Sequence, residues 1–171
     1  MNIATKFTQQ SAANFEQTES FRADYLQALR LIERLHRLLL DVIKDEFDRV
    51  GGTEVNSVQA LLLYNIGDAE LTAGELRTRG YYLGSNVSYN LKKLVDTGYL
   101  HYKKSKIDKR SVRISLTEKG RLACDIVDRL YERQLASLAV VGGVNQGDVR
   151  QLNRALIRFE RFWSDQIRYR L

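Results

Sequence analysis

Basic side chains are concentrated between Gly84 and Arg113. The segment holds eight Lys or Arg residues and two Asp residues, so its net charge of +6 equals the formal charge of the whole 171-residue chain. The eight cations are Lys92, Lys93, Lys103, Lys104, Lys106, Lys109, Arg110 and Arg113. Because the rest of the chain is close to neutral, the basicity forms a local patch. Such a patch is typical of a surface that binds a polyanion, and the alternative is a solvated surface without a partner.

This basic segment also has the element order of a winged helix-turn-helix. An amphipathic helix is predicted over Ser85–Thr97 and is closed by Gly98. Strand-forming residues follow over Tyr99–Lys104, and after the basic loop Ser105–Ser111 the run Val112–Leu116 alternates apolar and polar residues, as a half-buried strand does. The basic loop would be the wing of this fold.

One side of the predicted helix at 85–97 carries polar and basic residues that could face DNA. A helix of this length fits the major groove of B-DNA, with its N-terminal residues nearest to the base edges. Asn can bond adenine in a bidentate fashion, while Ser and Tyr are less specific partners. The helix residues that we expect to contact DNA are Ser85, Asn86, Ser88, Tyr89, Asn90 and Lys92. A solvated face in a helical bundle is the alternative.

Four residues of the loop complete the predicted DNA-binding set: Lys106, Asp108, Lys109 and Arg110. A hairpin tip that carries Arg can enter the narrow, electronegative minor groove. Asp108 adds a negative charge to a loop that is expected to meet a polyanion. We hypothesise that its carboxylate holds the Arg110 guanidinium in one rotamer and so lowers the entropy lost on binding.

The residues before the basic segment predict an arm and helices. Residues 1–20 lack periodicity and are rich in Gln, Asn, Ser and Thr, which favours a flexible arm. Apolar residues at three- and four-residue steps predict a long amphipathic helix over 21–50. Shorter helices are predicted at 56–66 and 72–79. In the second of these, Glu75 follows the first Thr with capping-box spacing.

Two further helices are predicted after the wing, at 117–141 and 148–169. The last helix and the long first one carry more apolar surface than a small winged domain can cover. We therefore predict dimerisation helices at 21–55 and 142–171, and a winged helix-turn-helix DNA-binding region with its connecting helix at 56–141. The predicted fold class is mainly α with a small β wing. Two-fold symmetry would place two recognition helices about 34 Å apart; a single-chain helical bundle is the alternative.

The wing carries the residues of a known pattern. Asp108-Lys-Arg110, followed by Leu116-Thr117 and Gly120, resembles the DxR…LTxxG signature of MarR-type winged-helix regulators, with matching spacing. Upstream residues that match the helix-turn-helix core and turn of that family are Leu76, Val87, Ser88, Leu91, Leu94, Val95 and Gly98. The resemblance covers residues 25–168. It implies an obligate homodimer that binds a pseudo-palindromic operator and, in many members, loses DNA affinity when a small ligand or an oxidant acts.

Within this family, the N-terminal arm and the stretch YYLGSNVSYNLKKL look similar to the alphaproteobacterial LdtR-like branch, which is associated with the regulation of cell-wall L,D-transpeptidases and stress. Many family members carry Arg near the middle of the recognition helix, where this chain has Tyr89 and Asn90. Guanine reading by a bidentate Arg is therefore not expected there. We expect A-T-rich readout through Asn86 or Asn90, with shape readout by the wing.

The resemblance also implies a ligand cleft between the dimerisation region and the winged domain. His36, Arg37 and Tyr64 are expected near it, where they could orient a small aromatic or acidic effector. A histidine in such a place is more often satisfied within the protein core. Redox-sensing members carry their cysteine in the N-terminal region, which Cys124 does not match, so we predict that Cys124 is a buried, inert thiol.

These observations favour one class of function over two others. We predict a cytoplasmic, sequence-specific transcriptional regulator that acts on double-stranded DNA as a homodimer, modulated by a small ligand. The alternative is a winged-helix interaction module that uses its basic wing to bind an acidic protein. An enzyme is not expected, because we find no nucleophile–base pair or phosphate-binding glycine loop. One Cys and two His give no zinc-ligand spacing, and no apolar run reaches membrane-spanning length, so no metal, cofactor or membrane is predicted.

Overall fold

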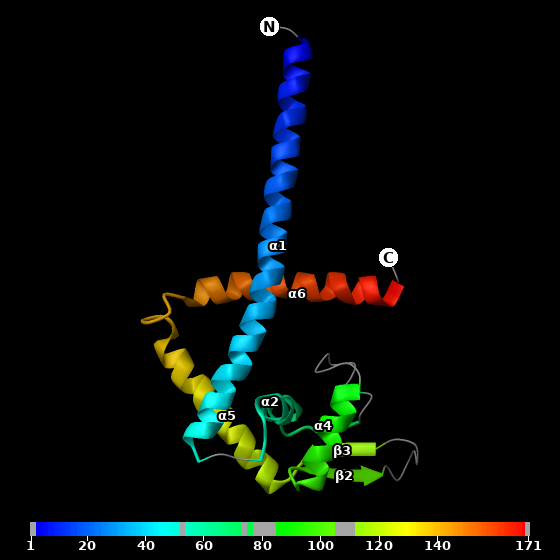
Figure 1. Cartoon of the computed structure of the whole chain (residues 1–171), viewed down its shortest axis with the longest axis vertical. Coiled ribbons are helices and arrows are strands. Elements are labelled where there is room, and N and C mark those ends of the chain that lie inside the picture. The colour runs from blue at the N-terminus through cyan, green and yellow to red at the C-terminus, as the bar shows by residue number, and fades with distance from the viewer. Residues whose placement is uncertain (1–2, 52–53, 73–74, 77–84, 105–111, 170–171) are drawn as a thin grey trace.

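The protein is mainly α-helical with one small sheet (Figure 1), as predicted. The computed structural model describes residues 3–51, 54–72, 75–76, 85–104 and 112–169. In chain order the elements are α1 (Ile3–Arg49), α2 (Ser57–Ile66), β1 (Leu71–Thr72), α4 (Ser85–Asp96), β2 (Leu100–Lys104), β3 (Val112–Leu116), α5 (Glu118–Leu138) and α6 (Gln146–Tyr169). Every predicted helix and strand whose residues are described is present, and all but the first helix begin and end within a few residues of the expected positions.

Polar caps determine where several helices begin. The Asn56 side chain accepts a hydrogen bond from the Gln59 N–H at 2.9 Å, and the Gln59 side chain accepts one in return from the Asn56 N–H at 3.2 Å. Thr72 and Glu75 make the same reciprocal pair, which confirms the predicted capping box there. The remainder of that predicted helix, 77–79, lies outside the described residues.

The sheet has three antiparallel strands in the order β1-β3-β2, and two of them were predicted. β1 consists of two residues, with Leu71 opposite Ile114. Such a short strand is missed by sequence reasoning because two residues cannot display an alternating pattern. β2 and β3 pair along their full lengths, from Leu100 opposite Leu116 to Lys104 opposite Val112.

One apolar core lies beneath this sheet and among the helices of the winged region. Leu63 of α2, Leu94 of α4, Ile114 of β3 and Val127 of α5 are all essentially inaccessible to solvent. The end of α1 contributes Ile43, which is also fully buried. Leu91 and Leu94, two of the residues predicted for the helix-turn-helix core, are both buried, so α4 is held to the rest of the winged region by apolar packing.

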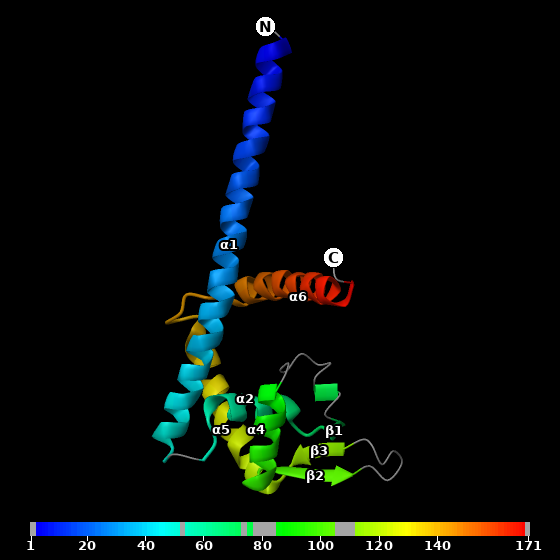
Figure 2. The ribbon, with the colours of Figure 1, turned by 45° about the vertical axis from the view of Figure 1, so that its right-hand side comes forward.

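Residues 3–20 differ from the expectation of a flexible arm, because they form the first part of α1. The chain has no Pro and its first Gly is Gly51, so no residue interrupts the helix before that point. A formed helix also extends at little cost, since each added residue contributes a hydrogen bond. The N-terminal half of α1 projects well beyond the winged region in both views (Figures 1 and 2).

Helix α6 crosses α1 at a distance from the sheet (Figure 1). The two helices meet through the stacked rings of Tyr25 and Phe159, whose centroids are 6.0 Å apart, and Phe159 in turn contacts Trp163. Among the described residues of α6 none is buried. No helix in the described part of the chain is long and apolar enough to cross a membrane.

Candidate nucleic-acid interface

The predicted recognition helix α4 has one buried face and one polar face. Leu91 and Leu94 are buried in the core, whereas Ser88, Tyr89 and Lys92 are exposed. Tyr89 keeps 66% of its surface accessible even though it is a large aromatic residue. This face therefore offers hydroxyl groups and an ammonium group to a partner, as the sequence predicts.

Asn90 has a different environment from the other residues of the predicted set. It is half-buried, and its Oδ1 atom accepts a hydrogen bond of 3.1 Å from Nε2 of Gln59. Gln59 itself is almost completely buried and belongs to α2. Because this bond joins α2 to α4, the geometry favours a positioning role for Asn90 over base reading. Sequence periodicity could not reveal this, since it does not tell which residue of α2 lies opposite.

The remaining residues of the predicted DNA-binding set are only partly described. Ser85 and Asn86 form the first turn of α4, where free backbone N–H groups favour a phosphate, but their side chains are not among the described ones. Lys106, Asp108, Lys109 and Arg110 lie outside the described residues. Their contacts with DNA, and the pairing of Asp108 with Arg110, stay predictions.

The base of the wing brings two cations together. Lys103 of β2 lies directly opposite Arg113 of β3, so their side chains share one face of the sheet, and both are exposed. Like charges opposite one another destabilise a sheet, and Glu70, 3.5 Å from Arg113, offsets part of the charge. This unfavourable arrangement is typical of a surface whose charge is neutralised by a bound polyanion.

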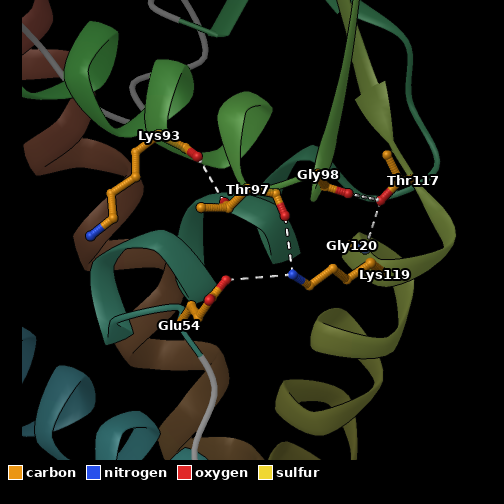
Figure 3. A network of polar contacts seen from close by, with 7 residues as sticks. All are labelled: Glu54, Lys93, Thr97, Gly98, Thr117, Lys119 and Gly120. Carbon is orange, nitrogen blue, oxygen red and sulfur yellow. Dashed lines mark hydrogen bonds and ion pairs between the residues drawn. The ribbon is translucent and has the colours of Figure 1, made fainter.

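The LTxxG part of the signature has a clear structural role at the start of α5. The Thr117 hydroxyl accepts a hydrogen bond from the Gly120 N–H at 3.0 Å, which caps α5, and donates to the Gly98 carbonyl at 2.7 Å, just after α4 (Figure 3). A Cβ atom on Gly120 would lie 2.3 Å from the carbonyl oxygen of Tyr99. Only glycine therefore allows α5 to approach the α4–β2 turn so closely.

The predicted effector residues come from two helices and have different partners. His36 and Arg37 are exposed on α1, and Arg37 pairs with Glu33 at 2.7 Å. The Tyr64 hydroxyl donates to Asp128 of α5 at 3.2 Å. Burial and this contact with Asp128 raise the pKa of Tyr64. These contacts give no support to a common site for the three residues, and their role stays a prediction.

An apolar cleft that sequence reasoning missed lies between α1 and α6, with a volume of about 810 Å³. Its walls are mainly aromatic and aliphatic, with one acidic and one basic residue. The lining residues are Phe21, Asp24, Tyr25, Ala28, Ala155, Arg158, Phe159 and Phe162. The apolar periodicity of the two helices predicts dimerisation only, because it does not show where two helices lie far enough apart to leave a cleft.

Cys124 is half-buried near the start of α5. Burial, with smaller contributions from the carboxylates of Asp125 and Asp68, raises the pKa of its thiol to about 12. A thiol with such a pKa is almost entirely protonated near neutral pH, and the thiolate is the reactive form. The environment supports the predicted inert thiol, although the residue is less completely buried than expected.

Similarity to known proteins agrees with this geometry. Residues 55–120 match the family described as "Winged helix DNA-binding domain". The chain is 37% identical over 148 residues to the exopolysaccharide II synthesis transcriptional activator ExpG of Rhizobium meliloti. The aligned residues cover 85% of this chain and 74% of that protein.

Solved structures give the same fold. A MarR family regulator from Listeria monocytogenes, complexed with 26mer DNA, has a TM-score of 0.70 at 22% identity, covering 82% of this chain and 91% of that one. Streptococcus pneumoniae FabT in complex with DNA has a TM-score of 0.61 at 19% identity, covering 82% and 98%.

The chain belongs to the same family of transcriptional regulators as ExpG, carries a winged-helix DNA-binding domain, and has the fold of MarR-type regulators. It is therefore a DNA-binding regulator and not an enzyme. The alternative of a module that binds an acidic protein gains no support from these relatives. Membership in the LdtR-like branch is not confirmed and stays a prediction.

Proposed function

We propose that the protein regulates transcription as a homodimer that binds a pseudo-palindromic operator, with α4 of each protomer in a major groove. The observation that carries this proposal is the two-sided character of α4: Leu91 and Leu94 fix it to the core while Ser88, Tyr89 and Lys92 remain exposed. Lys103 and Arg113, which lie opposite each other on β2 and β3, add positive charge at the base of the wing. Because operators lie on cellular DNA, we infer action in the cytoplasm.

The homodimer is supported by apolar surface that one chain leaves uncovered. Leu152, Leu156 and Phe162 of α6 keep 52%, 38% and 52% of their surface accessible, and Phe21 of α1 keeps 74%. Exposed apolar patches of this kind mark sites of association. Packing of α1 and α6 from two protomers would bury these side chains and hold two copies of α4 in the orientation that two half-sites require.

A small aromatic or acidic effector is part of the proposal. The cleft between α1 and α6 shares Phe21 and Phe162 with the proposed dimer interface, so a ligand there would lie at that interface. The cleft has the volume and the mainly apolar lining that small-molecule sites have, and Arg158 could orient an acid. The related regulator ExpG is named as an activator of exopolysaccharide II synthesis. This supports testing activation first, on promoters of exopolysaccharide genes.

The test is a measurement of DNA affinity against salt concentration, using an operator selected from a random duplex library. We expect a steep loss of affinity with salt, because each phosphate contact releases counterions. Lys92→Ala should lower the magnitude of the log–log slope by about one. Arg161→Ala removes the same charge from an 86% exposed side chain of α6, a helix that lies apart from α4 (Figure 1), and should leave the slope unchanged. A flat salt dependence of the unmodified protein would contradict the proposal.

The oligomeric state needs a measurement of its own. Sedimentation equilibrium of the full chain should give twice the monomer mass, and the operator complex should contain two chains per duplex. A monomer that binds the operator with full affinity would refute the homodimer while leaving DNA binding intact.

A further inference from the structure

The C-terminal end of α4 is closed by its own backbone. The Gly98 N–H donates to the Val95 carbonyl at 3.0 Å, and the Tyr99 N–H donates to the Leu94 carbonyl at 2.8 Å. Gly98 has a φ of +78°, which completes the Schellman arrangement of a helix end. The carbonyl oxygen of Thr97, the residue just after α4, is a further acceptor at this end, where a helix carries a partial negative charge.

Lys119, from the first turn of α5, supplies the partner for this carbonyl. Its Nζ atom donates to the Thr97 oxygen at 3.0 Å and lies 3.6 Å from a carboxylate oxygen of Glu54 (Figure 3). The same atom stands 4.3 Å from the centre of the Tyr99 ring. The ammonium group thus contacts the end of α4, the segment before α2 and the start of the wing. The aromatic face and the helix end both favour a cation at this point.

These contacts complete a two-point attachment of α4. The Gln59–Asn90 hydrogen bond fixes the middle of the helix to α2, and the Lys119–Thr97 hydrogen bond, next to the Thr117–Gly98 bond, fixes its end to α5. Two attachments at different heights restrain both the tilt of α4 and its rotation about its own axis. In a major groove, such restraint determines which base edges the side chains reach.

We propose that Lys119 is a positioning residue for sequence recognition: it sets the orientation of α4 without touching DNA. The proposal rests on the proposed function, in which α4 enters the major groove. The proposal predicts that replacing Lys119 lowers the affinity for the operator but not the affinity for random DNA. Binding to random DNA depends on phosphate contacts and tolerates a small change in the direction of α4, whereas binding to the operator depends on the fit of base contacts.

The experiment compares Lys119→Met with Lys119→Arg and the unmodified protein on the selected operator and on a random duplex of equal length. Methionine keeps the aliphatic stem and removes the charge and the donor, whereas arginine keeps both. For Lys119→Met we expect roughly a tenfold loss of operator affinity, the scale of one charged hydrogen bond. Affinity for the random duplex and the salt slope should not change, and Lys119→Arg should recover most of the loss.

Lys44→Met is the matched control, because it removes the same charge from an exposed side chain on α1 and should change neither affinity. A lower salt slope with equal losses on both duplexes would show that Lys119 binds a phosphate directly, which would overturn the proposal. An unchanged operator affinity in Lys119→Met would also overturn it. Failure of the unmodified protein to prefer any sequence would instead refute the proposed function, so the two failures are distinguishable. Thermal unfolding of each variant verifies that it is folded.

Discussion

The winged region of this protein buries its apolar side chains within one chain, whereas the outer helices, α6 and α1 before Ile43, leave theirs accessible. All the described buried apolar residues lie between Ile43 and Leu130, in one core that joins α2, α4, α5, the sheet and the end of α1. Helix α6 is also amphipathic, but its described residues include none that is buried. The comparison teaches that the same helical pattern can mean a core face or a surface that needs a partner.

The largest effect is expected inside the winged region. Leu63 of α2 is fully buried, so Leu63→Ala should lower the free energy of unfolding by about 2–5 kcal/mol through lost burial and the cavity left behind. Urea unfolding measures this, and the loss should be the same at every protein concentration. A loss that grows as the protein is diluted would mean that the winged region is not stable by itself.

The second-largest effect is expected from a substitution on α6, which should weaken the dimer and therefore depend on protein concentration. Phe162→Glu places a charge on the exposed apolar face of α6, where Phe162 is 52% accessible. We expect the dimer to dissociate at least 30-fold more readily, on the order of an interface hot spot, with operator binding lost in parallel. Sedimentation of the variant measures the first, and fluorescence anisotropy the second.

Arg161→Glu tests whether the face of α6 matters. Arg161 is 86% exposed and neighbours Phe162 in sequence, but lies on a different side of the helix. It should leave the dimer largely intact. If both variants dissociate the dimer equally, general charge on α6 would be the cause, and the assignment of a specific apolar face would be wrong.

The two regions also differ in how far the sequence predicts them. Within the winged region, β3 was predicted at Val112–Leu116, where the structure has it, and the capping box of Thr72 and Glu75 is present. These features are local, since alternation and capping involve residues a few positions apart. The helical state of 3–20 was not predicted, because a polar composition suggests disorder and does not reveal the continuity of α1.

Features that depend on distant residues could not be predicted at all. The bond from Gln59 to Asn90 joins residues 31 positions apart, and the one from Lys119 to Thr97 joins residues 22 positions apart. Composition and periodicity identify which residues are polar, but not which polar residue lies opposite. The signature glycine Gly120 was recognised from its spacing, whereas its reason, the close carbonyl of Tyr99, required the structure.

The smallest effect, a modest loss of unfolding free energy, is expected where the end of α1 joins the winged region. Glu46, in the last turns of α1, is 7% exposed and pairs with Arg49 and with Arg133 of α5, each at 2.6 Å. Its hydrogen bond with Arg49, opposed by burial and assisted by Arg133, lowers the pKa of the carboxyl from 4.5 to about 2. Breaking a buried pair costs about 3–5 kcal/mol, but both guanidinium groups are half exposed, so we expect about 1–2 kcal/mol for Glu46→Gln at pH 7.

The pH dependence of this difference gives the sharper test. A carboxyl with a lowered folded-state pKa stabilises the protein fully above its ordinary pKa of 4.5, and this contribution disappears as the pH falls from there to about 2. The gap in unfolding free energy between the unmodified protein and Glu46→Gln should therefore be constant above pH 5 and shrink below 4.5. Glu33→Gln, which removes one partner of an exposed pair on α1, should cost under about 0.5 kcal/mol. A Glu46→Gln gap that persists undiminished at pH 3 would show that packing, and not charge, joins the outer helix to the winged region.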